Sequence, residues 1–182
     1  ESGGTSGGEG VDTGFHPDRK LADGEIVMIG DLAVTALHMP GHFGNHLCFA
    51  CDDMILTGDL VMAWASTLIS PPDGDVGDYR RSLTRLLQFG ASVFHPGHGA
   101  PVTDPAGRIT ALLKHRQARE DAILAQLGTG RQSVTDLTLS IYTDIPPALL
   151  PAAQRNVLAH LIDLQNCGLA CNTGGDSFWQ RI

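Results

Sequence analysis

The chain is short of cysteine, aromatic side chains and positive charge, and it has no long apolar run. Four cysteines in 182 residues are too few for a fold held by disulfides, so we expect reduced thiols and a cytoplasmic location. Lysine and arginine number 12 against 20 acidic residues, and the net charge of −8 disfavours nucleic acid as a ligand. No apolar segment reaches the length of a membrane span and no signal peptide is visible, so no membrane partner is expected.

Glycine is abundant instead, and it is concentrated at the start of the chain. Residues 1–10 read ESGGTSGGEG, a composition that cannot bury apolar surface, and we predict a flexible segment and lead-in over residues 1–24. The chain begins without Met, so its first residue is not expected to be the native start. The whole chain is 42% hydrophobic and 18% charged, which is a globular composition.

Hydrophobic periodicity predicts a mixed α/β unit over residues 25–128. Short alternating segments separated by Gly-Asp and Asp-Asp pairs indicate strands, and apolar residues at helical spacing indicate helices. The expected order is a pair of hairpins over 25–39 and 46–58, a loop over 63–77, a helix over 78–89, a short strand from 92, and a long helix that Asp104 caps and Gly128 ends.

The pattern changes over residues 129–182, where a small winged-helix-like domain is predicted. Ser133 and Asp136 form the spacing of a capping box at the start of a short helix, a second helix covers 151–166, and a hairpin closes the chain. Arg155 is the sole lysine or arginine of that second helix. We therefore favour a structural or dimerisation role over nucleic-acid binding for this domain, which leaves a homodimer open.

The cysteine spacing is a poor fit to a zinc ribbon. Cys48 and Cys51 are an odd number of positions apart in a predicted strand, so their side chains should point to opposite faces. Cys171 lies in the predicted terminal hairpin, and nothing local brings it near Cys48. We therefore do not expect the cysteines to share a metal ion.

Histidines 38, 42 and 46 are spaced by four, which on a helix would place them on one face. Pro40 and Gly41 lie among them and argue against a helix, so the segment is expected to be a strand that ends in a turn. That geometry places His42 beyond the end of a strand, where functional sites of α/β sheets are built.

Two further metal-ligand residues occupy equivalent positions. Asp59 follows the strand sequence MILTG, and His98 follows SVFHPG. Each lies beside glycine, which allows the backbone to turn sharply and to approach a bound group. Together with His42 they predict a metal site at the strand ends.

The segments PGHFGNH, TGD and PGHG, in this order and spacing, resemble metal-binding motifs of the metallo-β-lactamase-fold hydrolases. The resemblance covers roughly residues 20–127 and implies one half of an αββα sandwich. It also implies that His42 binds a first metal ion, that Asp59 bridges two metal ions and acts in catalysis, and that His98 binds the second. His46 matches a histidine that supports the ligands without binding metal.

A defining part of the family pattern is missing. The family's HxHxDH signature lies on an earlier loop, and this sequence contains no HxH at all. The chain is therefore expected to hold only part of a metal site. Three explanations stay open: the chain is the C-terminal piece of a longer protein, the other half is a separate partner chain, or the site has been lost while the fold was kept.

The resemblance implies metal-dependent hydrolysis. Two divalent metal ions, with zinc as the default and iron or manganese as options, would supply a metal-bound hydroxide that attacks an ester, thioester, lactone or phosphodiester. A small ester or thioester is the favoured substrate, and Trp64, Ser66 and Thr67 on the loop after Asp59 are candidates to contact it. The isolated chain is expected to be inactive. The alternative is a catalytically inactive binding or assembly module.

Overall fold

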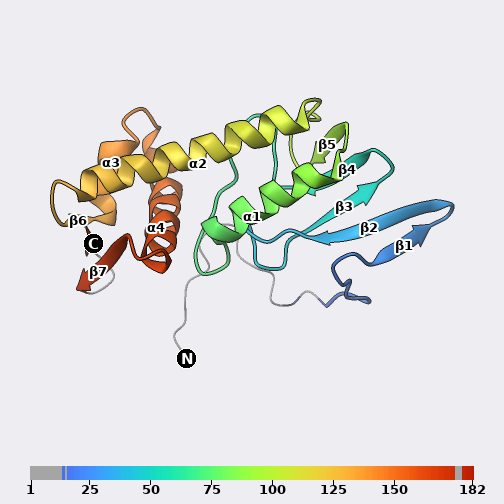
Figure 1. Ribbon diagram of the computed structural model, residues 1–182, viewed down its shortest axis with the longest axis horizontal. Coiled ribbons are helices and arrows are strands. Elements are labelled where there is room, and N and C mark those ends of the chain that lie inside the picture. Colours follow the sequence, from blue (N-terminus) through green and yellow to red (C-terminus); the bar gives the residue numbers. More distant parts are fainter. Residues whose placement is uncertain (1–13, 15, 175–177) are drawn as a thin grey trace.

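The computed structural model describes residue 14, residues 16–174 and residues 178–182, so the predicted flexible segment over 1–10 lies outside the described residues. The chain is a mixed α/β structure whose main helices and strands follow the predicted order, with β6 (Gln132–Ser133) as an addition (Figure 1). The elements are β1 (Ile26–Ile29), β2 (Leu32–His38), β3 (Leu47–Cys51), β4 (Met54–Gly58), α1 (Val76–Leu86), η1 (Leu87–Phe89), β5 (Val93–Pro96), α2 (Pro105–Leu127), β6 (Gln132–Ser133), α3 (Val134–Ile141), η2 (Pro147–Leu149), α4 (Leu150–Asn166), β7 (Ala170–Gly174) and β8 (Phe178–Arg181).

The main sheet has the strand order β1-β2-β3-β4-β5. Strands β1 to β4 form an antiparallel meander with tight turns at Gly30-Asp31 and Asp52-Asp53. Asp52 has φ of +50°, a left-handed conformation that Asp tolerates better than most residues. Strand β5 lies parallel to β4, because the chain crosses over through α1 before it returns to the sheet.

Helices α1 and α2 cover one face of this sheet. Alternate residues of the strands point to that face, as the period of two in a strand requires. These strand residues pack against Tyr79, Leu83 and Leu86 of α1 and against Ile109 and Leu112 of α2. The strand residues in this core include Leu37, Cys48, Ile55 and Phe94.

The opposite face of the sheet is apolar and carries no helix among the described residues. A hollow of about 360 Å³ lies over it. Cys51 lines this hollow while Cys48 lies in the helix-covered core, so the predicted opposite orientation of the two cysteines is observed. The other lining residues are Leu21, Val27, Ile29, Leu32, Val34, Phe49, Met54 and Leu56.

Side-chain caps set the helix starts. The Asp75 carboxylate accepts a hydrogen bond from the backbone N–H of Asp78, so α1 begins at Val76, two residues before the predicted start at 78. The predicted cap at Asp104 is confirmed, because its side chain accepts from the N–H of Gly107 with Pro105 at the first helical position.

Helix α2 connects two hydrophobic clusters. Figure 1 shows it running from the main sheet to the C-terminal helices. Its last turns place Ile123 and Leu127 in a second core with α3, α4 and Trp179, so packing continues across the predicted boundary at 128 and 129. Although α2 has 23 residues, no helix of the described residues is both long and apolar enough to cross a membrane.

The C-terminal part has the outline of a winged helix. Strands β6, β8 and β7 form a three-stranded sheet in that order beside α3 and α4. The sequence predicted the β7–β8 hairpin but not the two-residue strand β6, which is too short to carry a periodic signal. The Ser133 hydroxyl accepts from the N–H of Asp136 and caps α3, as predicted.

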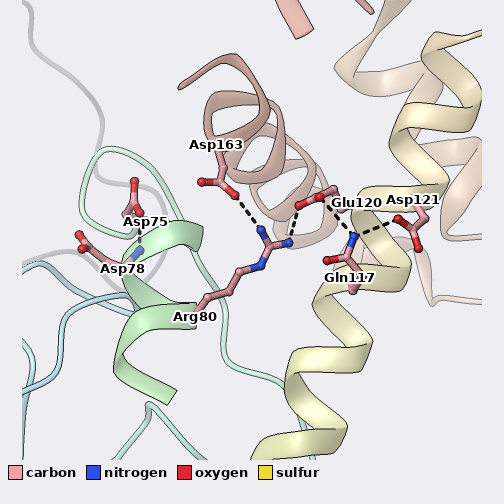
Figure 2. A network of polar contacts seen from close by, with 7 residues as sticks. All are labelled: Asp75, Asp78, Arg80, Gln117, Glu120, Asp121 and Asp163. Carbon is pink, nitrogen blue, oxygen red and sulfur yellow. Dashed lines mark hydrogen bonds and ion pairs between the residues drawn. The ribbon is translucent and has the colours of Figure 1, made fainter. Parts of the chain in front are cut away.

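A charged network joins this part to the main unit. Figure 2 shows Arg80 of α1 between two carboxylates, Asp163 of α4 and Glu120 of α2. The Arg80 Nη1 atom lies 3.1 Å from Asp163 Oδ2. Gln117 donates to Glu120 and to Asp121 at the edge of the same network. Because both carboxylates are largely buried, these ion pairs are screened less than surface pairs and fix α4 against α1 and α2.

His160 is enclosed where α4 packs against the main unit. Its side chain is 1% exposed, and neither ring nitrogen has a hydrogen-bond partner among the described residues. Burial, together with the charges of Arg116 and Arg80, lowers the pKa of His160 to about 3. The folded protein therefore holds a neutral imidazole where the unfolded chain would bind a proton in mild acid.

This difference predicts an acid-sensitive stability. Since the pKa is lowered on folding, the stabilisation is complete above the ordinary value of 6.5 and is lost as the pH falls from there towards about 3. One such group changes the free energy of unfolding by up to about 1.4 kcal/mol per pH unit. In denaturant titrations, His160→Leu should flatten the decline between these values, and His16→Gln, at an exposed site, should keep the wild-type profile. Identical slopes for wild type and His160→Leu would contradict the assignment.

Candidate metal centre

Three strands end at the same edge of the main sheet. Strand β3 runs antiparallel to both β2 and β4, so β2 and β4 point the same way, and β5 is parallel to β4. The segments that follow these three strands carry His42, Asp59 and His98. The topology therefore brings the three predicted ligand residues to one edge, as the strand-end positions in the sequence suggested.

The turn before His42 is pressed against α1. Gly41 has φ of +143°, and a Cβ atom there would lie 2.4 Å from the Tyr79 Cα atom. The Gly41 carbonyl accepts from the N–H of Asp75, and the Ser82 hydroxyl donates to the Pro40 carbonyl at 2.6 Å. Glycine is therefore required at 41, and the start of α1 fixes the turn that presents His42.

The His42 ring is held through its Nδ1 atom. Nδ1 lies 2.8 Å from the carbonyl oxygen of Leu68 and 3.0 Å from the hydroxyl oxygen of Thr67. A carbonyl oxygen can only accept a hydrogen bond, so this contact assigns the proton to Nδ1. Nε2, which has no hydrogen-bond partner among the described residues, keeps its lone pair. This is the arrangement of a metal-ligating histidine, whose other nitrogen donates to a backbone carbonyl.

Asp59 and His98 face each other across neighbouring strand ends. The His98 Nε2 atom lies 3.6 Å from Asp59 Oδ2. The backbone N–H of Gly97 donates to the Gly58 carbonyl at 2.9 Å, which ties the two segments together. The other carboxylate oxygen, Asp59 Oδ1, is buried without a hydrogen-bond partner among the described residues. A Cβ atom at Gly97 would lie 2.7 Å from this oxygen, so glycine keeps the space beside it open.

His46 contacts both the Thr57 backbone and the ring of His42. Its Nε2 atom donates to the Thr57 carbonyl at 3.1 Å, and its ring centroid is 6.1 Å from that of His42. Burial lowers the pKa of His46, the Thr57 carbonyl opposes this shift, and the neighbouring His42 adds to it. A neutral ring locked to the backbone suits the expected supporting role, which stays a prediction.

The three predicted substrate-contacting residues on the loop after Asp59 differ in their exposure to solvent. Trp64 is 71% exposed, so it is not a core anchor, and Ser66 is partly exposed. Arg108 of α2 donates to the carbonyls of Met62 and Ala65, both at 2.7 Å, and so holds the backbone on both sides of Trp64. The Trp64 indole also lies against Gly99, next to His98.

Thr67 differs from its neighbours on this loop. Its side chain is 1% exposed and its hydroxyl contacts His42. This burial leaves Thr67 no surface to offer a substrate. Substrate contact therefore stays a prediction for Trp64 and Ser66, while the observed contact of Thr67 is with His42.

The residues present fit part of a metal site. Within the residues that the structure describes, no three His, Cys, Asp or Glu side chains converge closely enough to hold an ion by themselves. The unpartnered Oδ1 of Asp59, the free Nε2 of His42 and the imidazole of His98 nevertheless supply the oxygen and nitrogen donors that zinc, iron or manganese accept.

Comparison with known proteins decides the family. Residues 3–98 match the family model of the metallo-beta-lactamase superfamily, and residues 133–179 match that of the beta-lactamase associated winged helix domain. The chain belongs to the metallo-beta-lactamase superfamily. The predicted resemblance is thus confirmed, and with it the half-sandwich followed by a winged helix.

Solved structures support the same fold. A metallo-beta-lactamase family protein from Thermus thermophilus superposes with a TM-score of 0.79 at 29% identity, covering 89% of this chain and 54% of that one. A beta-lactamase domain protein from Burkholderia ambifaria gives a TM-score of 0.82 at 24% identity, over 90% of this chain and 52% of that one, and it supports the fold alone.

Among curated relatives, an atrochrysone carboxyl ACP thioesterase from Claviceps purpurea is 32% identical over 130 residues, 67% of this chain and 41% of the relative. A beta-lactamase-like protein 2 homolog from Drosophila melanogaster is 29% identical over 162 residues, 87% of this chain and 53% of the relative. The chain thus spans about half, or less, of the length of these relatives.

Several residues that shape the site were not found from the sequence. Leu68 acts through its carbonyl and Arg108 through bonds to loop carbonyls. Every residue has a backbone carbonyl, and an arginine in a helix reads as surface charge, so neither left a signal in the sequence. Gly97 was visible only as part of the PGHG motif.

The turn at Gly41 gives a test of how the site is built. Gly41→Ala should lower the free energy of unfolding by more than about 2 kcal/mol, because the methyl group meets the Tyr79 backbone as well as an unfavourable φ. Gly30→Ala is the matched control, since Gly30 has φ of +63° but open space around its Cβ position. It should lose about 1 kcal/mol from φ alone. If urea titrations show that Gly41→Ala and Gly30→Ala lose the same free energy of unfolding, the close packing of Gly41 against Tyr79 is contradicted.

Proposed function

We propose that the chain is part of a metal-dependent hydrolase that cleaves an ester or thioester, with His42, Asp59 and His98 as its share of the metal ligands. The observation that carries this proposal is the Asp59 carboxylate. One of its oxygens is buried without a partner among the described residues, and the other lies 3.6 Å from His98 Nε2. Burying an unpaired carboxylate oxygen is costly, and a cation beside it would remove that cost.

Each residue has a defined part in the proposed site. His42 would bind through Nε2, because its Nδ1–H is donated to the Leu68 carbonyl. Asp59 has two oxygens and can therefore bridge two ions, and His98 would bind the second ion beside it. Divalent ions held there, with zinc expected and iron or manganese suited to the same donors, would activate water and polarise the group under attack.

The favoured substrate is a thioester or ester of a small molecule. Relatives named as carboxyl ACP thioesterases support the thioester, while lactones and phosphodiesters suit the same chemistry. Trp64 and Ser66 lie on the loop after Asp59, whose backbone Arg108 holds, and we propose that they contact the acyl part. The net charge of −8 weighs against a polyanionic substrate.

A further segment would complete the protein. The sequence lacks the HxHxDH signature, and one whole face of the sheet is apolar with a hollow of about 360 Å³. We propose that the preceding part of a longer protein, or a partner chain, covers this face and supplies the remaining ligands. The 182 residues alone would then be inactive.

The uncovered sheet face also favours a second candidate function. A large apolar surface marks an interaction site, so the chain could act as a catalytically inactive binding or assembly module. A stable partner that lacks the HxHxDH signature would favour this module. A partner that carries the signature would favour the hydrolase.

The winged-helix part is proposed to be structural, with a homodimer contact as an option and nucleic acid not favoured. Two arginines, one on α2 and one in this part, already pack on aromatic side chains of this part. The Arg119 guanidinium stacks on Tyr142, and that of Arg131 stacks on Phe178, both at 4.3 Å from the ring centroid. These stacked guanidinium groups stabilise the fold and are poorly placed to bind phosphates.

Substitution of the ligands tests the hydrolase. In the complete protein, His42→Ala, Asp59→Ala and His98→Ala should each lower kcat/KM for a thioester by roughly a hundredfold or more, because each removes a metal ligand. A chelator should abolish activity, and one of zinc, manganese or iron should restore it. His115→Gln, on α2 and at no ligand position, is the control and should keep wild-type kinetics.

The outcomes separate the two candidates. Hydrolysis that survives a chelator or all three alanine substitutions contradicts a metal-dependent enzyme. A metal-free complex that forms stably and hydrolyses none of the four ester classes supports the assembly module instead.

A further inference from the structure

The peptide group between Leu68 and Ile69 is held at both ends. Its carbonyl oxygen, from Leu68, accepts the Nδ1 proton of His42 at 2.8 Å. Its N–H, from Ile69, donates to the Asn156 Oδ1 atom at 3.2 Å. Because a peptide group is planar and trans, fixing the direction of the N–H also fixes the direction of the carbonyl. Asn156, on α4, therefore determines where the acceptor for His42 points.

Arg116 of α2 sets the orientation of Asn156. The Arg116 Nη1 atom donates to Asn156 Oδ1 at 3.1 Å, so this oxygen receives hydrogen bonds from a guanidinium and from a backbone N–H. Both groups can only donate, which assigns the amide oxygen to that side. The Nη2 atom of Arg116 donates in addition to the Thr67 carbonyl. Arg116 thus binds the Thr67–Leu68 peptide group, and Asn156 binds the Leu68–Ile69 peptide group that follows it.

Burying the charged side chain of Arg116 lowers stability, so a purely structural role does not explain it well. Its side chain is 1% exposed, its Nε atom has no partner among the described residues, and its hydrogen bonds go to neutral oxygens. The guanidinium lies 5.2 Å from the ring centroid of Tyr79, whose backbone packs against the turn before His42. A buried charge without a carboxylate partner costs more than an apolar side chain of similar volume. Its position is explained if these contacts serve the site.

The helix that carries Asn156 is joined to its neighbours by ion pairs. Arg80 joins α4 to α1 and α2 through Asp163 and Glu120 (Figure 2). Asn156 lies two turns before Asp163 on the same helix, and its neighbour Val157 is buried in the second core. Helix α4 therefore presents the Asn156 amide from a fixed position.

We propose that Asn156 and Arg116 are positioning residues for His42: through the Leu68–Ile69 peptide they keep the proton on Nδ1 and the lone pair of Nε2 directed to the metal site. The winged-helix part thereby contributes to the centre without touching the reacting atoms. The inference rests on the proposed function for the meaning of that lone pair. The hydrogen-bond chain itself stands without a metal.

The test reads the His42 tautomer by ¹⁵N NMR of the imidazole rings in the 182-residue chain, at mildly alkaline pH. Wild type should show the proton on Nδ1 alone. Asn156→Leu, similar in volume but without an acceptor, should convert His42 to a mixture of both tautomers. Asn156→Asp, which can accept both hydrogen bonds, should restore the wild-type spectrum. Val157→Ala, which leaves a cavity at the next position of α4, is the matched control and should leave the tautomer unchanged.

Metal binding gives a second readout. In the complete protein, Asn156→Leu should weaken Co²⁺ affinity by roughly ten- to a hundredfold, as loss of a support behind a ligand does, while Asn156→Asp and Val157→Ala should bind as wild type. A wild-type His42 protonated on Nε2 overturns the inference at once, whether or not the variants fold. The inference is also overturned if Val157→Ala changes the His42 tautomer and the Co²⁺ affinity as much as Asn156→Leu does. A protein that binds no metal but shows the predicted tautomers would contradict the proposed function and leave the positioning intact.

Discussion

The parallel pairing of β4 with β5 is the constraint on which the site depends. It places the segments after the two strands at one edge, and the hydrogen bond from the Gly97 N–H to the Gly58 carbonyl fixes their separation. Asp59 and His98 consequently face each other although a helix separates them in the sequence. The antiparallel path through β3 brings the end of β2, and so His42, to the same edge. Were β5 antiparallel, His98 would lie at the opposite end of the sheet.

Several buried polar groups of the described residues lack a hydrogen-bond partner, and two of them lie at or beside the proposed site. The Asp59 carboxylate, the Arg116 guanidinium and the His160 imidazole each have a buried atom without a partner among the described residues. Such groups lower the free energy of unfolding, and proteins keep them where they bind a ligand or fix the geometry of a site. Under the proposed function a cation would account for Asp59 Oδ1, and the proposed positioning role would account for Arg116, which donates to the Thr67 carbonyl and to Asn156. For His160 we predict an acid-sensitive stability and assign no role at the site.

Much of the fold could be predicted from the sequence, because turns, caps and periodicity are local signals. The Asp52-Asp53 turn and the caps at Asp104 and Ser133 lie where the sequence placed them. The three predicted ligand residues could be singled out because glycines mark the turns that carry them. The supports could not be found, since Leu68 contacts His42 through its backbone and Asn156 binds the N–H of the next residue, Ile69, from a distant helix. Their contacts depend on how α4 packs, which no local pattern records.

The most direct measurement is the intact mass and metal content of the purified protein, taken together. The account predicts a species larger than the 19.3 kDa of this chain, or a second polypeptide, carrying the HxHxDH signature and about two divalent ions per site. A single 19.3 kDa species that holds no metal, even after incubation with zinc, manganese or iron, would contradict the metal centre assigned to His42, Asp59 and His98.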